Sequence, residues 1–473
     1  MMRRNVLLAG AGAAALALSG CAVGPAYVSP TPAAPGQTPF LEAGKSPAFT
    51  GEQPAGHWWS LFGDPTLDAL VEEALAANTD LRVAAANLAQ ARAVLKESRA
   101  GRLPTTGISA SGTYARQPGS VTGIGPVEGE SYDVGLDIGY QVDLFGRVES
   151  AIRASRADAD AVQAAFDLTR ITVAAETTRA YADVCAYNRQ LAVAEETLRI
   201  QEQTFDLTRR LFEGGRATRL DTGQAGALLE QTRATLPTLK AQRAGALYRL
   251  ALLTGKPPAE APQAALQCQA PPELDRPIPV GDGAALLARR PDIRRAERQL
   301  AAAAARVNVA TADLYPSISI GGSVGSTADA VSGLGKSDSF RFSIGPLISW
   351  SFPNIAVARA RLKQAEAGAD AALATFDGTW LGALQETESA LANYAGELDR
   401  LAALRRAADE AGEAARIARL RYQAGRENFQ VVLDAERSLA QIQASIAQSE
   451  QQRATHLVAL FLALGGGWQD GAA

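Results

Sequence analysis

The chain has 473 residues, a formal net charge of −4 and 47% hydrophobic residues, and only 6% of the chain is aromatic. Acidic and basic residues are interspersed, without the lysine and arginine cluster that nucleic-acid binding requires, so we exclude a nucleic-acid partner. Long stretches dominated by Ala, Leu, Gln, Glu and Arg are typical of long helices that pack through narrow seams.

Residues 1–20 have the pattern of an export signal. A positively charged start precedes an apolar run over residues 6–18, which is too short to remain as a membrane-spanning helix. The run ends in Leu-Ser-Gly before Cys21, which resembles a bacterial lipobox. We expect Cys21 to carry a diacylglycerol and an N-acyl chain such as palmitate; the alternative is an ordinary signal peptide with an incidental cysteine. Residues 21–56, rich in Pro, Gly, Ser and Thr, are then a lipidated tether.

Two further cysteines follow, Cys185 inside a long predicted helix and Cys268 in a segment rich in proline and alanine. An oxidising compartment would allow them to pair. Their spacing matches no disulfide or metal-binding signature, so we expect two separate free thiols.

The sequence contains an internal repeat. Leu103-Pro104 recurs 212 residues later as Tyr315-Pro316, and the segments around residues 75–81 and 287–293 match at the same offset. Self-similarity of this kind indicates a repeat architecture. We therefore predict a first repeat over residues 57–255, a linker over 256–282, a second repeat over 283–467 and a tail over 468–473.

Each repeat is predicted to contain a helix, two strands, a very long helix, a turn and a long helix. The strands show strict alternation of apolar and polar residues, which predicts one apolar and one polar face. The alternating apolar positions are Ile108, Ala110, Tyr114, Tyr132, Val134, Leu136, Ile138, Tyr140, Val142, Ile318, Ile320, Val324, Phe340, Phe342, Ile344, Ile348, Trp350 and Phe352.

A soluble sandwich would also give this alternation. Four strands per chain cannot close a membrane barrel, which needs at least about eight, but an oligomer can pool them. We therefore expect a shared barrel with its apolar face outward. Pro346 lacks the N–H of a ladder bond, so we expect a bend or bulge there.

The longest helices are expected over residues 146–213 and 356–424, each spanning about 100 Å. Leu191, Leu198, Phe205 and Phe212 are spaced seven apart, which indicates a coiled-coil seam. Pro237 should kink the return helix of the first repeat.

The segment from His57 to Pro65, HWWSLFGDP, resembles the opening motif of the TolC-like outer-membrane factors, and most closely their NodT-type lipoprotein branch. RYQAG over residues 421–425 with LDAER over 433–437, and the ending LGGGW over 464–468, are similar to that family's periplasmic turn and C-terminus. The resemblance implies a mainly α-helical fold with a membrane β part, in which a homotrimer builds a helical barrel joined to a transmembrane barrel of about twelve strands.

The resemblance also implies a periplasmic gate at the second-repeat turn, formed by Tyr422, Gln430, Asp434 and Arg437. Asp434 and Arg437 lie three apart on a helix and can pair; the alternative is a solvated pair without a gating role. Gln430 stands where related lipoproteins have an apolar constriction residue, which favours a hydrogen-bonded or looser closure.

Both helical turns are expected to dock a periplasmic adaptor. The residues concerned are Gly215, Arg216, Thr218, Leu220, Asp221, Gly425, Arg426 and Asn428. Thr218 and Asp221 equally fit a helix N-cap with an acidic first turn, which is a purely structural role.

The function implied is the passive outer-membrane exit channel of a tripartite efflux system that includes an adaptor and an inner-membrane pump. Type I protein secretion is an alternative, and a periplasmic coiled-coil scaffold is the rival from another class. The only two histidines, His57 and His456, are far apart and away from other ligand types, so we expect no enzyme activity, no metal and no cofactor beyond the lipid on Cys21.

Overall fold

The computed structural model describes residues 23–30, 38–53, 56–118, 126–274 and 276–466. The chain divides into two compact units. The first, here the strand unit, comprises residues up to Pro30 with Leu88–Val162 and Arg295–Phe376, and the second, here the helical unit, comprises Thr31–Asn87, Gln163–Arg294 and the chain from Asp377 onward.

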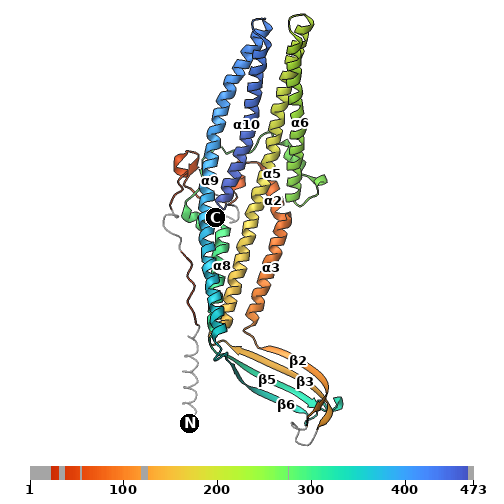
Figure 1. The fold of residues 1–473 in the computed structure, drawn as a ribbon, viewed down its shortest axis with the longest axis vertical. Helices are drawn as coiled ribbons and strands as arrows, with labels where there is room; N and C mark the ends of the chain where they lie inside the picture. Colours follow the sequence, from red (N-terminus) through yellow and green to blue (C-terminus); the bar gives the residue numbers. More distant parts are fainter. Residues whose placement is uncertain (1–22, 31–37, 54–55, 119–125, 275, 467–473) are drawn as a thin grey trace. The chain divides into compact units, whose positions relative to one another are not determined.

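The element order is the same in both halves of the chain (Figure 1). The first half contains α2 (Pro65–Ala77), α3 (Thr79–Ala100), β2 (Thr105–Gln117), β3 (Val127–Val142), α5 (Arg147–Glu213) and α6 (Arg219–Leu253). The second half contains α7 (Gly283–Arg289), α8 (Pro291–Ala312), β5 (Ser317–Ala328), β6 (Phe340–Ser349), α9 (Ala356–Gln423) and α10 (Phe429–Ala463). The predicted order is confirmed, except that the first helix of each half is divided in two.

The very long helices are confirmed as α5, with 67 residues, and α9, with 68 residues. The return helix α6 runs as one element through Pro237, so the proline does not end it. Within the part of the chain that the structure describes, no helix has the length and apolarity needed to cross a membrane.

The strand unit contains an antiparallel sheet in the order β2-β3-β5-β6, in which the β3–β5 ladder joins the two halves of the chain. The register confirms the predicted faces, because Ile108, Leu136, Val324 and Phe342 lie side by side across all four strands. On the opposite face Arg341 forms an ion pair with Asp133, which also accepts a hydrogen bond from Thr327.

The bulge expected at Pro346 is absent from the described sheet. Pro346 lies opposite Ile320 in a ladder that runs without interruption from Ser317–Ser349 to Ser326–Phe340. The physical reason is that β6 is an edge strand of this sheet, where a missing N–H is tolerated.

The HWWSLFGDP motif forms part of the core of the helical unit. The ring of Trp58 is fully buried and stacks on Phe461, with ring centroids 4.7 Å apart. Asp64 caps α2 by accepting hydrogen bonds from the N–H groups of Thr66 and Leu67, and it also accepts one from the Tyr181 hydroxyl at 2.6 Å. The motif therefore fixes the start of the first repeat onto both long helical pairs of this unit.

Equivalent residues close the two repeats. The side chain of Asn78, between α2 and α3, donates to the Leu253 carbonyl oxygen at 3.0 Å, and Arg290, between α7 and α8, donates to the Ala463 carbonyl oxygen at 2.8 Å. Arg290 is buried and forms ion pairs with Asp292 and Glu386 at 2.6 and 2.8 Å. One repeat uses a neutral amide where the other uses a charged group.

The expectation of two free thiols is wrong, because Cys185 and Cys268 form a disulfide with their Cα atoms 5.1 Å apart. Cys185 is fully buried in α5, and Asn188, one turn further along, donates to the backbone carbonyls of Leu266 and Cys268. These bonds hold the linker against α5 and bring the sulfurs together. The linker also supplies β4 (Ile278–Pro279), which pairs in parallel with β1 (Phe49–Thr50) from the predicted tether.

Candidate functional site

The candidate site comprises the two helical turns of the helical unit. The first turn connects α5 to α6 and the second connects α9 to α10. Gly215 and Gly425 end the long helices in the left-handed region, at φ values of 72° and 69°. The N–H groups of Arg216 and Arg426 then bond back to the Leu211 and Arg421 carbonyls at 2.7 and 2.9 Å. Both turns thus use the same helix-ending geometry, which glycine permits without strain.

The return helices begin with different caps. Thr218 and Asp221 form a reciprocal capping box at α6, in which each side chain accepts a hydrogen bond from the other residue's backbone N–H. The N-cap interpretation of these two residues is therefore confirmed. At α10 the Asn428 side chain alone accepts from the Val431 N–H, at 3.1 Å. The two turns are neighbours, because a Cβ placed on Gly425 would lie 3.4 Å from Nη2 of Arg216.

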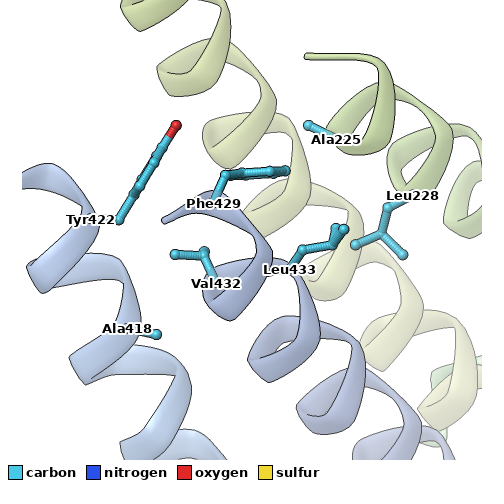
Figure 2. Close-up of a cluster of buried hydrophobic side chains, with 7 residues drawn as sticks. All are labelled: Ala225, Leu228, Ala418, Tyr422, Phe429, Val432 and Leu433. Carbon is cyan, nitrogen blue, oxygen red and sulfur yellow. The ribbon is translucent and has the colours of Figure 1, made fainter. Parts of the chain in front are cut away.

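Tyr422 lies in a hydrophobic cluster behind the second turn. Its ring is buried and packs on Phe429 with centroids 5.6 Å apart. Figure 2 shows side chains of α6, α9 and α10 converging there, from residues Ala225, Leu228, Ala418, Tyr422, Phe429, Val432 and Leu433. Burial raises the pKa of the Tyr422 hydroxyl, which lies beside Thr208. Tyr422 therefore joins helices of the two repeats within the core.

The other three predicted gate residues are exposed on α10. The Gln430 amide donates to both carboxylate oxygens of Asp434, at 3.0 and 3.1 Å. Among the ion pairs of the described residues, none joins Asp434 to Arg437, so the expected pair is not formed within the chain. Arg437 instead lines a cavity of about 770 Å³ between α5, α6 and α10. The helix spacing would allow Asp434 and Arg437 to pair, but the Asp434 carboxylate is bonded to Gln430, one turn earlier on α10.

Glu436 is a further residue of this region, and sequence reasoning missed it. The residue is 5% exposed, and its carboxylate accepts a hydrogen bond from the Thr204 hydroxyl at 2.8 Å and forms an ion pair with Arg419 at 3.3 Å. Burial raises the pKa of Glu436, while Thr204 and Arg419 oppose that shift. The signal was present in the pattern, because Glu436 continues the apolar stripe of Phe429, Val432 and Leu433.

The remaining predicted docking residues lie on the surface of the turns. Leu220 is 68% exposed, although it is a large apolar residue in the first turn of α6. Arg426 is exposed, and Arg421 forms an ion pair with Glu427 beside it at 3.5 Å. Exposed Phe212 and Leu420 add apolar area near the two turns. This surface combines apolar and basic groups.

Some predictions fall elsewhere. Cys21, the signal over residues 1–20 and the tail over residues 468–473 lie outside the described residues. Among the side chains that the structure describes, no group of three or more His, Cys, Asp or Glu is arranged to hold a metal ion.

Comparison with known proteins decides the family. The family model described as "Outer membrane efflux protein" matches residues 70–256 and 284–466. The chain belongs to the outer membrane efflux protein family. This efflux protein is 35% identical to outer membrane protein OprJ of Pseudomonas aeruginosa, over 97% of this chain and 95% of the relative. It is 30% identical to nodulation protein T of Rhizobium leguminosarum bv. trifolii, over 96% of each chain.

A solved structure of the outer-membrane channel OprN is similar to this efflux protein throughout. The two share 37% identity with a TM-score of 0.89, over 95% of this chain and all of the other. The resemblance to outer-membrane factors is thus confirmed, and so is the outer-membrane location. The family consists of outer-membrane efflux channels and not of enzymes.

Proposed function

We propose that this chain forms the exit duct of a tripartite efflux system, in which three copies pool their sheets into one transmembrane barrel. The observation that carries the proposal is the two-faced sheet of the strand unit. Phe342, Ile344 and Ile348 are all more than 60% exposed on its apolar face, whereas the other face carries Asp133 and Arg341. An exposed apolar surface of this kind marks contact with lipid or another subunit.

The open edges of the sheet support the oligomer. In the described sheet β2 and β6 each pair with one neighbour only. An open edge in lipid would leave backbone N–H and C=O groups without partners, which is costly. A barrel needs at least about eight strands, so four per chain must be pooled, and three copies would supply twelve. The apolar face would then contact lipid and the polar face would line a wet lumen.

The periplasmic part of the proposal concerns the two turns. The duct passively conducts substrates that an inner-membrane pump and a periplasmic adaptor deliver, and the exposed surface with Leu220, Arg426 and Phe212 docks the adaptor. A diacylglycerol and an N-acyl chain on Cys21 anchor each copy. No catalytic residue and no further cofactor takes part.

We place the gate at the second turn, where the contact between Gln430 and Asp434 is exposed on α10. Repeated by threefold symmetry, these side chains would form a ring of amides and carboxylates at the aperture. Exposed polar contacts contribute little each, about 0–1 kcal/mol, so partner binding can rearrange them. The equivalent of Asp434 in the first turn is Gln224, which offers no carboxylate.

Single-channel conductance in planar bilayers tests the proposal. We expect rare, small openings in the wild type and frequent openings in the Gln430→Ala/Asp434→Ala double variant. Gln224→Ala is the matched control, because it removes an amide at the equivalent position of the other turn. A conducting wild type that both variants leave unchanged would refute this gate and retain the duct. Inserted trimers without any conductance would instead support the scaffold function.

A further inference from the structure

A cavity of about 730 Å³ lies in the strand unit, where β3, β5 and β6 meet the adjoining helices. Residues from three chain connections line it, at 141–147, 312–317 and 349–361. The gate and the docking surface proposed above use none of these residues, and the duct uses only those at the ends of its strands. Its chemistry can be established from three features: its aromatic rim, its charges and the path of the tether.

Aromatic rings mark the rim of the cavity. Trp350 stacks on Phe352 with centroids 4.8 Å apart, and Phe145 stacks on Tyr315 at the same distance. Trp350 and Phe352 are 50% and 66% exposed, although both are large aromatic residues. Exposed aromatic rings at the ends of membrane strands are typical of the boundary between acyl chains and lipid headgroups. In the proposed barrel these rings place the cavity at headgroup depth.

The charges in the cavity have both signs and balance. Its lining contains two carboxylates, Asp143 and Asp313, and two guanidinium groups, Arg147 and Arg361. Asp143 already accepts hydrogen bonds from the N–H groups of Val148 and Glu149. Nε of Arg147 donates to Oδ1 of Asp313 at 2.7 Å.

Two charged groups remain for a ligand. Arg361 is exposed and forms no ion pair with any other described residue. Asp313, which also lines the cavity, uses Oδ1 for Arg147, and its Oδ2 forms no hydrogen bond among the described contacts. The cavity thus offers one cation without an ion pair and one carboxylate oxygen without a hydrogen bond. This combination suits a ligand that carries both a negative and a positive charge.

The tether supplies an independent indication of lipid at this place. The Val23 N–H donates to the carbonyl oxygen of Phe145, a residue of the cavity lining, at 3.4 Å. Val23 is two residues from Cys21, the expected lipid anchor. The anchor itself is a glyceride without a phosphate or an amine, so it does not explain the charged lining.

We propose that this cavity binds the headgroup of a zwitterionic phospholipid, such as phosphatidylethanolamine. Arg361 contacts the phosphate, Asp313 contacts the ammonium group, and the rings of Trp350 and Phe352 lie against the glycerol and the upper acyl chain. The inference rests on the proposed transmembrane barrel, which puts the ends of the strands at the membrane boundary, and goes beyond it by naming a bound lipid.

Native mass spectrometry of the full-length protein extracted in mild detergent tests the site. Phosphatidylethanolamine is titrated in mixed micelles, in parallel with phosphatidylglycerol and with inorganic phosphate. The covalent anchor remains in the mass of the denatured chain, whereas a bound phospholipid is lost on denaturation, so the two sources of lipid are distinguished. We expect phosphatidylethanolamine to bind more tightly than phosphatidylglycerol.

Arg361→Gln should weaken phosphatidylethanolamine binding about tenfold, because it removes a charge-assisted hydrogen bond to the phosphate. Lys363→Gln is the matched control, because it removes an exposed positive charge from the same helix outside the cavity. Asp313→Asn should abolish the preference for phosphatidylethanolamine over phosphatidylglycerol while retaining phospholipid binding.

Equal binding by Arg361→Gln and Lys363→Gln would overturn the proposal, and so would competition by inorganic phosphate, which would indicate a site for free anions. Conductance of Arg361→Gln in planar bilayers separates this inference from the duct. If Arg361→Gln loses the lipid and still conducts, the lipid site is supported and the duct is retained. If the wild type binds the lipid without conducting, the lipid site is supported and the duct is refuted.

Discussion

Gly226 lies on α6 behind the first helical turn, and Glu436 occupies the equivalent position on α10 behind the second. A Cβ on Gly226 would lie 3.3 Å from the ring of Phe205, so an aromatic ring closes the space behind the first turn. Behind the second turn the Glu436 carboxylate is held by Thr204 and Arg419. Two turns with the same backbone thus differ at this one equivalent position, which makes an apolar contact on α6 and carries a buried ionisable group on α10.

The same contrast recurs where each repeat closes on its own last helix. Asn78 forms this contact in the first repeat with an amide, and Arg290 forms it in the second with a guanidinium group. The first repeat has a covalent clamp in addition, the disulfide between α5 and the linker. At both pairs of equivalent positions, the second repeat therefore has a charged side chain where the first repeat has a neutral residue.

The largest expected effect comes from breaking the covalent clamp. Cys185→Ser/Cys268→Ser opens a loop of 83 residues, and we expect the free energy of unfolding to fall by about 4 kcal/mol. Urea titration of the purified protein in detergent measures the change. Wild type treated with a reductant should match the variant, and hydrogen exchange should rise in the linker and α5 but not in α9. An equal rise in α9 would contradict a clamp specific to the first repeat.

A smaller effect is expected from the closing contacts. Arg290→Met should cost about 3 kcal/mol, because it removes the cation paired with Asp292 and the shorter of two hydrogen bonds to the Ala463 carbonyl. This cost is at the lower end of the range for breaking a buried ion pair, because the side chain of Glu386 is 58% exposed. Asn78→Ala should cost about 1–2 kcal/mol, because it removes the hydrogen bond to Leu253 and those that Asn78 accepts from the N–H groups of Asp80 and Leu81. Urea titration compares the two, with Arg295→Met as an exposed control.

The pH dependence should distinguish the two turns. The folded-state pKa of Glu436 is raised by burial, so its contribution to stability is fully present below its unfolded pKa and is lost as pH rises through the folded value. The stability of wild type relative to Glu436→Gln should therefore fall as pH is raised from 4 towards 8. Unfolding titrations at several pH values measure this difference. A difference that stays constant with pH would exclude a titrating Glu436.

The smallest effect concerns the caps. Thr218→Ala removes a reciprocal capping box and should cost about 1 kcal/mol, and Asn428→Ala, which removes a single cap, should cost about the same or less. Hydrogen exchange at the first turns of α6 and α10 detects the local loosening. The comparison would need revision if Asn428→Ala loosened its helix more than Thr218→Ala.

Features that depend on local periodicity were predictable from the sequence. The alternation from Tyr132 to Val142 and the heptads of α5 are set by residues close in the chain, and the duplicated pattern fixed the order of elements in both halves. The capping box at Thr218 is likewise a local signal. Contacts between distant segments were not predictable. The disulfide depends on where the linker docks, and the burial of Tyr422 and Glu436 depends on helices that lie more than 200 residues apart in the chain.

The ladder between β3 and β5 has a consequence for assembly of the protein after export. Its pairs run from Tyr132–Ala328 to Val142–Ile318, so the inner strand of the first hairpin is completed only by a strand of the second half. During export the first hairpin emerges with one side of β3 unpaired and with its apolar residues uncovered, until residue 318 has followed. A chaperone that shields exposed strands would act in that interval, and a chain truncated within the linker would remain its client permanently.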